Sequence, residues 1–187
     1  MKKVYKYILL TVAGIMLYRF SKAGSMANKF SKFTEPEALK LLAIQNALTI
    51  AGFKQPQLDF ALAQLLFETG KFSKASTVAA ANNNYSGIKW INKPYQAATK
   101  GTLAPASERL PYESPVNYYA KFADTNAWAK DFKRILSLKR TANYAGSPIT
   151  ATTPEDFVKR LKLNGYFGGS EAAYLRGVKI YLAKFVK

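Results

Sequence analysis

The feature of this 187-residue chain that most constrains its fold is a segment of about 45 residues, 73–119, in which no helical periodicity survives. Asn, Pro, Gly, Thr and Ser are frequent there, and "NYYAKF" at its end suits a strand. Apolar residues at helical spacing precede and follow it. A structureless segment of that length in a compact domain is usually a binding loop or a lid. The sequence therefore predicts an α+β fold, mostly α: two helices, a small irregular or β lobe, then three helices.

Capping residues mark the expected helix boundaries. Thr34, with Glu37 three residues later, forms a capping box for a first helix that Gly52 ends. A second helix is expected over about 56–69, ended by Gly70. The three later helices each follow a hydroxyl residue suited to the N-cap position, namely Thr125, Thr153 and Ser170.

The N-terminal region, residues 1–20, differs from the rest of the chain. Lysines precede an uncharged apolar segment, 7–18, and basic residues follow it. Twelve helical residues span roughly 18 Å, which is short for a bilayer core of about 30 Å, although flanking Tyr, Lys and Arg can snorkel. We expect an N-terminal hydrophobic helix that is a membrane anchor or a signal segment, with a buried helix of the domain as the alternative. A small, polar and basic linker is expected over 21–33, and one domain over 34–187.

Composition limits the chemistry. The chain has no cysteine and no histidine, which excludes Ser-His and Cys-His catalysis and the common zinc sites. We expect no metal and no cofactor, and acid–base chemistry must come from Asp, Glu, Tyr or Lys. A net charge of +17 favours a polyanionic partner such as an anionic cell wall, a membrane or a nucleic acid, with a merely soluble basic surface as the alternative.

Glu68 is the acid that the pattern singles out. It lies in the last turn of the second expected helix, at the margin of the apolar stripe and between Phe67 and Phe72. An apolar setting and the negative end of the helix dipole both disfavour the ionised carboxylate, so both raise its pKa. A carboxylic acid that keeps its proton near neutral pH can protonate a glycosidic oxygen. The alternative is a solvated glutamate at a helix end.

Two motifs around Glu68 resemble a known family. "FETGKFSKAS" followed by "NNNYSGIKW" is similar to the signature of glycoside hydrolase family 73, the peptidoglycan-hydrolysing glucosaminidases: a helix ending in Glu-Ser-Gly, then Asn-Asn-aromatic-x-Gly-Ile-Lys. "NYYAKFAD" and "DFVKRLKLNGYFGGSEAAYLRGV" are similar to the family's later segments, so the resemblance covers about 36–185. The chain departs from the family at Lys71, where Trp is common, and at 167–169, where Ala-Thr-Asp is usual.

The resemblance implies a lysozyme-like fold and a substrate, the glycan strand of peptidoglycan, cut after N-acetylglucosamine. Glu68 would be the general acid in a groove between the helical body and the lobe, and Tyr166 would match the family's tyrosine near that acid. The positions expected to bind substrate are Asn84, Tyr85, Lys89, Trp90 and Tyr119, although we expect at least half of the lobe's aromatic side chains to form its small core.

A second catalytic carboxylate is harder to assign. An inverting enzyme needs one roughly 6.5–9.5 Å from the acid and a retaining enzyme one at about 5–5.5 Å. Glu108 best fits the family's spacing, Glu113 is the reserve, and Asp124 lies at the edge of the lobe. A substrate-assisted route or a lytic transglycosylase would need no second carboxylate.

Other functions remain open from the sequence. A cell-wall-binding module of the same fold would keep the groove without the acid. A structural membrane protein of a phage particle is a further alternative, and it is compatible with the hydrolase, because a particle that crosses a cell wall can carry a wall-cutting enzyme. We expect no nucleic acid as partner, since no recognised motif is found. The expected location is membrane-anchored and facing the cell wall, or in a membrane-containing virion, or secreted if the N-terminal segment is cleaved.

Overall fold

A computed structural model describes residues 29–70, 77–138 and 146–185 of the chain. Most of them are helical, and a small two-stranded sheet completes an α+β, mostly α fold, as the sequence predicts. Single-turn 3-10 helices lie at Pro94–Gln96, Ala106–Glu108, Pro115–Asn117 and Pro148–Thr150. The longer elements are α2 (Glu35–Ile50), α3 (Gln57–Thr69), α4 (Thr77–Asn82), β1 (Ala98–Leu103), β2 (Tyr118–Phe122), α5 (Thr125–Leu136), α6 (Pro154–Leu163) and α7 (Glu171–Phe185).

The N-terminal segment expected to be an anchor or signal, 1–20, lies outside the described residues. Within the described ranges, none of the helices is both long and apolar enough to cross a membrane. The end of the expected linker, 29–33, is part of the packed domain, because Phe30 is buried and its ring lies 6.0 Å from that of Phe185 in α7. The domain therefore begins before Thr34, where the sequence pattern placed its start.

Helix α3 is the centre of the helical body. Leu58 and every residue of 60–66 are buried, so the helix is covered on all sides rather than along one stripe. It packs against α2, α6 and α7 and against the 3-10 turn at Pro148–Thr150. Gly70 ends it in the left-handed conformation, at φ 56°, as the sequence predicts.

The helix starts agree with the capping pattern except at α5. The backbone N–H of Thr34 donates to Glu37 at the start of α2, and Thr153 accepts from the backbone N–H of Asp156 in α6. The cap of α5 is Asp124, whose carboxylate accepts from the backbone N–H of Ala127 at 2.8 Å, and not Thr125. Asp and Thr are both good N-caps, so the one-residue ambiguity lay in the sequence itself.

The lobe is more ordered than the sequence suggests. β1 and β2 pair antiparallel, with Ala98 opposite Phe122 and an irregularity between Lys100 and Leu103. β2 lies in the "NYYAKF" segment predicted to be a strand. Helix α4 was not predicted, because its six residues, TVAAAN, are too few to show a helical period.

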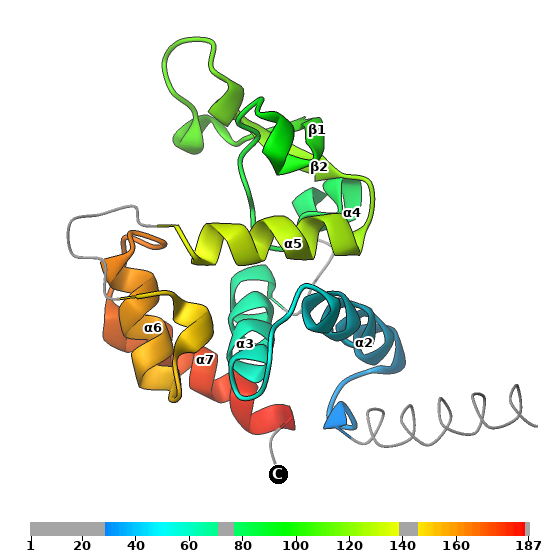
Figure 1. Ribbon diagram of the computed structural model, residues 1–187, viewed down its shortest axis with the longest axis vertical. Coiled ribbons are helices and arrows are strands. Elements are labelled where there is room, and N and C mark those ends of the chain that lie inside the picture. The colour runs from blue at the N-terminus through cyan, green and yellow to red at the C-terminus, as the bar shows by residue number, and fades with distance from the viewer. Residues whose placement is uncertain (1–28, 71–76, 139–145, 186–187) are drawn as a thin grey trace, which may run out of the picture.

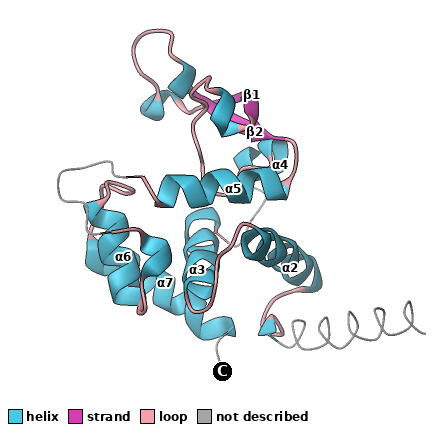
Figure 2. Cartoon of the chain, in the orientation of Figure 1, coloured by secondary structure: helices cyan, strands magenta, loops and turns pink. Residues whose placement is uncertain are grey.

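Helix α5 lies between the lobe and the body. In Figure 1 the sheet and α4 are on one side of it and α2, α3, α6 and α7 on the other. Figure 2 shows that the strands are confined to the lobe. Trp128 and Phe132 of α5 are fully buried, and their rings stack on each other at 5.3 Å between centroids. Phe132 also stacks on Phe53, which follows α2, so α5 belongs to the core on which the lobe rests.

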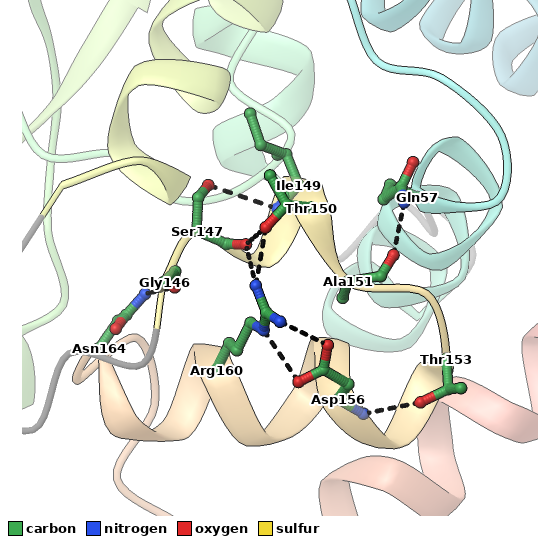
Figure 3. A network of polar contacts seen from close by, with 10 residues as sticks. All are labelled: Gln57, Gly146, Ser147, Ile149, Thr150, Ala151, Thr153, Asp156, Arg160 and Asn164. Carbon is green, nitrogen blue, oxygen red and sulfur yellow. Dashed lines mark hydrogen bonds and ion pairs between the residues drawn. The ribbon is translucent and has the colours of Figure 1, made fainter.

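A polar network joins residues 147–151, which precede α6, to α6 and to α3. Arg160 of α6 binds Asp156 on its own helix and reaches Thr150 and the Ser147 carbonyl of the preceding segment (Figure 3). Gln57 of α3 donates to the carbonyl of Ala151 at 2.5 Å. These bonds join α6 to the start of α3 through the segment that precedes α6.

Candidate active site

A pocket of about 410 Å³ lies where the body meets the lobe. Glu68 enters it from the end of α3 and Tyr166 from the connection between α6 and α7. The opposite wall is the loop that follows α4, and the C-terminal half of α5 closes the pocket. The other residues that line it are Ser86, Gly87, Ile88, Lys89, Ile91, Gln96, Arg134, Ile135 and Leu138.

Three neutral groups hold the Glu68 carboxyl. The hydroxyl of Tyr174, in α7, donates to Oε1 at 2.5 Å, and the hydroxyl of Tyr166 donates to Oε2 at 3.4 Å. The side-chain amide of Gln64, one turn earlier in α3, donates to Oε1 at 3.5 Å. No cation is among these partners, so nothing in this set compensates a full negative charge with a positive one.

The surroundings raise the pKa of Glu68 to about 7. Burial is the largest cause, and the hydrogen bonds from Tyr174, Gln64 and Tyr166 act in the opposite direction because they stabilise the carboxylate. Solvent reaches the exposed side chain through the pocket, yet protein atoms crowd the carboxyl group. These protein atoms replace part of the water around the carboxyl group, so the charged carboxylate is less well solvated and the pKa rises. Glu68 can therefore carry its proton near neutral pH.

Aromatic packing fixes the position of Tyr174. The Phe167 ring stacks on it at 3.9 Å between centroids and 5° between planes, and Phe67 meets it edge-on at 5.1 Å. Gly177 allows this arrangement, because a Cβ at that position would lie 2.3 Å from the Phe67 ring. Phe167 is one of the departures from the family pattern, and in this chain it forms part of the support of the tyrosine that binds Glu68.

The three consecutive asparagines are structural. Asn82 exchanges two hydrogen bonds with Thr102 of β1, and Asn83, in the left-handed conformation at φ 49°, donates to the carbonyl of Phe122. Asn84 is buried and binds the N–H and C=O of Ile88 and the carbonyl of Ala120 in β2. Together they tie the 83–88 turn to the sheet. The motif therefore shapes the lobe wall, and Asn84 does not itself line the pocket.

Glu108, the expected second carboxylate, is placed differently. Its carboxylate pairs with the Lys89 ammonium at 2.5 Å and accepts from the Tyr119 hydroxyl at 3.0 Å. The bond to Lys89 lowers the pKa of Glu108, whereas burial and the bond to Glu108 raise that of Tyr119 to about 12. Glu108 is not among the pocket-lining residues, while Lys89 is. It reaches the pocket only through its lysine partner.

The remaining expected site residues lie behind or beside the lobe wall. Tyr85 is buried edge-on against Trp128, and Tyr119 is buried. Trp90 is half-buried, and its backbone N–H donates to the carbonyl of Tyr118. None of these three lines the pocket. Tyr85 and Tyr119 thus belong to the packed interior that we expected for about half of the lobe's aromatic residues. Of the two reserve carboxylates, Glu113 is highly exposed near Lys100 and Asp124 caps α5.

Several site residues were not predicted. Neither Tyr174 nor Gln64 was assigned a role at the site, although the place of Gln64 one turn before Glu68 was a usable signal. Arg134 and Gln96 reach the pocket through tertiary packing, which leaves no local pattern. In the described parts of the chain no three acidic side chains cluster closely enough to hold a metal ion. Comparisons with family profiles, curated proteins and solved structures gave no match.

Proposed function

We propose that this protein hydrolyses the glycan strand of peptidoglycan, with Glu68 as the general acid. The observation that supports this most directly is the surroundings of Glu68: a carboxyl group in a pocket, held by neutral donors, with a pKa raised by burial to about 7. The residues flanking it also resemble the glucosaminidases of glycoside hydrolase family 73. A lysozyme-like arrangement of the body and the lobe is part of the same proposal.

In the proposed reaction, protonated Glu68 donates its proton to the glycosidic oxygen as the bond to the anomeric carbon breaks. The carboxylate that results is stabilised by the hydroxyls of Tyr174 and Tyr166, which already point at its two oxygens. These bonds are stronger to a charged acceptor than to a neutral one, so they favour the product of proton transfer. Tyr166 lines the pocket, so it can also contact the sugar.

The residues that line the pocket favour a reaction route that needs only one carboxylate. Among the described residues that line the pocket, Glu68 is the only acid. Glu108 would have to leave its ion pair with Lys89 to act as a base or nucleophile. Attack by the N-acetyl oxygen of the substrate, or the intramolecular closure performed by a lytic transglycosylase, needs only Glu68. A transglycosylase is therefore the second candidate function.

The charge of the chain fits the proposed substrate and location. Net +17 attracts a wall rich in carboxylates and phosphates, and the attraction is long-ranged at low salt. We propose that the domain faces the cell wall, either tethered by residues 1–20 or carried by a phage particle.

Purified peptidoglycan digested by the full chain tests the function. Mass spectrometry of the soluble products should find reducing N-acetylglucosamine ends for a glucosaminidase and anhydro-muramyl ends for a transglycosylase. Glu68→Gln should release neither, whereas Glu35→Gln, an exposed glutamate in the first turn of α2, should match the native chain. Product release by Glu68→Gln at the native rate would reject the assignment of Glu68 as the acid. If the native chain released no products, the hydrolase would be rejected and a wall-binding module would be the remaining function.

A further inference from the structure

A second hollow, of about 460 Å³, adjoins the Glu68 pocket along α5. The two share Gln96 and Arg134 as lining residues, so they lie next to each other at these side chains. Tyr95 and Lys130 line the second hollow and do not line the first. The Glu68 pocket lies at the C-terminal half of α5, and the second hollow extends toward its N-terminal half.

Tyr95 presents an exposed aromatic ring in this second hollow. Its side chain is 62% exposed, and the Arg134 guanidinium carbon lies 5.1 Å from the ring centroid. Arg134 is held in turn by Asp131 at 2.5 Å, a carboxylate whose side chain is 2% exposed. Gln96 donates to the other oxygen of Asp131 at 3.4 Å. An ion pair with a buried carboxylate thus holds the guanidinium against which Tyr95 rests.

Such a ring has the chemistry that recognises a sugar. An aromatic face packs against the apolar C–H face of a pyranose, and polar side chains beside it bind the hydroxyl groups. Asn126 and Lys130 are exposed and supply an amide and a cation at the same hollow. A platform that is already held in place binds with a smaller loss of side-chain freedom.

We propose that the hollow beside Tyr95 is a second carbohydrate subsite, in which one sugar of a glycan strand stacks on Tyr95 while another lies against Glu68. The inference rests on the proposed function and adds to it. The protein would act on glycans of several sugars and would bind short fragments poorly, because a short fragment cannot occupy both hollows.

Binding of N-acetylglucosamine oligomers to the full-length chain tests the subsite. Every variant also carries Glu68→Gln, so that the oligomers are not hydrolysed during the measurement. Isothermal titration calorimetry gives the affinity for the dimer and for the hexamer. Tyr95→Ala should lower the ratio of hexamer to dimer affinity by about tenfold, as loss of a stacked aromatic anchor does. Tyr95→Phe keeps the ring and should keep the ratio. Tyr112→Ala, which removes a tyrosine 64% exposed elsewhere in the lobe, is the matched control.

The outcomes separate the subsite from the function. A Tyr95→Ala ratio equal to that of Tyr112→Ala overturns the subsite, and wall digestion by the native chain would still support the hydrolase. If neither oligomer binds and the native chain releases no wall products, both proposals are rejected together. A ratio that falls in Tyr95→Ala and is kept in Tyr95→Phe supports stacking on the ring.

Discussion

The body and the lobe place a carboxylate in opposite surroundings. On the body side, the partners of Glu68 among the described residues are neutral donors, and burial raises its pKa to about 7. On the lobe side, Glu108 is half exposed and paired with Lys89, and its pKa falls. The same type of side chain can therefore keep its proton near neutral pH in one place and is a paired anion in the other. Partners and burial, rather than residue type, decide which role is available.

The difference follows from where each carboxylate sits in the fold. Glu68 lies at the end of the central helix α3, where α7 and the connection carrying Tyr166 close around it. Glu108 ends a single 3-10 turn in the long β1–β2 connection, where burial is slight and a lysine is within reach. A helical body can surround a polar group with protein atoms even where a pocket admits solvent, whereas a two-stranded lobe mainly offers surface.

The largest effect should come from removing each acid in turn. Glu68→Gln should lower wall digestion by about 10²–10⁴-fold, the usual contribution of general acid catalysis. Glu108→Gln should lower it by less than about tenfold, because we assign Glu108 to supporting Lys89 and Tyr119. Initial rates of turbidity loss on purified walls measure both. Equal losses in the two variants would show that Glu108 takes part in the chemistry and would abolish the contrast.

The next largest effect concerns pH. Native activity should fall as pH rises above about 7, because Glu68 loses the proton it must donate. The Tyr174 hydroxyl stabilises the carboxylate, so Tyr174→Phe should raise the pKa of Glu68 and move the alkaline limb upward by about one pH unit. The phenyl ring keeps the stack on Phe167. A limb that moves to lower pH in this variant would contradict the assigned direction of the hydrogen bond.

A packing change should disturb the body wall alone. A Cβ at Gly177 would meet the Phe67 ring, so Gly177→Ala should cost about 1–3 kcal/mol in overpacking, offset by up to about 1 kcal/mol of helix propensity. Gly168→Ala is the control, because nothing lies within 4 Å of a Cβ there. Urea unfolding compares the two. A Gly177→Ala protein as stable as Gly168→Ala would mean that α3 and α7 have room to separate.

The smallest effects should differ in sign. Glu68 titrates at 4.5 when unfolded and near 7 when folded, so the native chain loses stability as pH rises through this window. After allowance for solvent in the pocket, Glu68→Gln should be about 1 kcal/mol more stable than native at pH 8 and no more stable below pH 4.5. The pKa of Glu108 is lowered, so its carboxylate stabilises the folded chain at pH values above the ordinary pKa of glutamate. Glu108→Gln should therefore lower the free energy of unfolding at pH 8, by under about 1 kcal/mol. Thermal unfolding at both pH values distinguishes them, and like signs would refute the contrast.

Local signals predicted the body better than the lobe. The capping box at Thr34, the left-handed Gly70 and the Thr153 cap were readable, because each acts within one turn of helix. The position of Glu68 near the end of an apolar helix was visible in the sequence for the same reason, and the structure places it in a pocket. The sequence suggested two causes for a raised pKa of Glu68, an apolar setting and the helix dipole. Burial is the largest cause in the structure.

What could not be predicted depends on contacts distant in sequence. Tyr174 binds a carboxylate 106 positions away, and Asn84 binds a strand 36 positions away. The hydrophobic periodicity within one helix or strand does not indicate such pairs. The Asn-Asn-Tyr motif shows the consequence: it suggested a substrate wall, whereas its side chains face inward and bind the sheet that carries the wall. A motif can thus mark a site by building its frame.

The junction between the pocket and the core gives the protein a built-in optical signal. The chain has two tryptophans, and both adjoin the pocket wall. The indole N–H of Trp128 donates to Ser86, which lines the pocket, and Trp90 lies between the lining residues Lys89 and Ile91. Any occupant that moves this loop changes the polarity around an indole. Intrinsic fluorescence should therefore follow glycan binding without a label, and replacing Trp90 by Phe would separate the buried emitter from the half-exposed one.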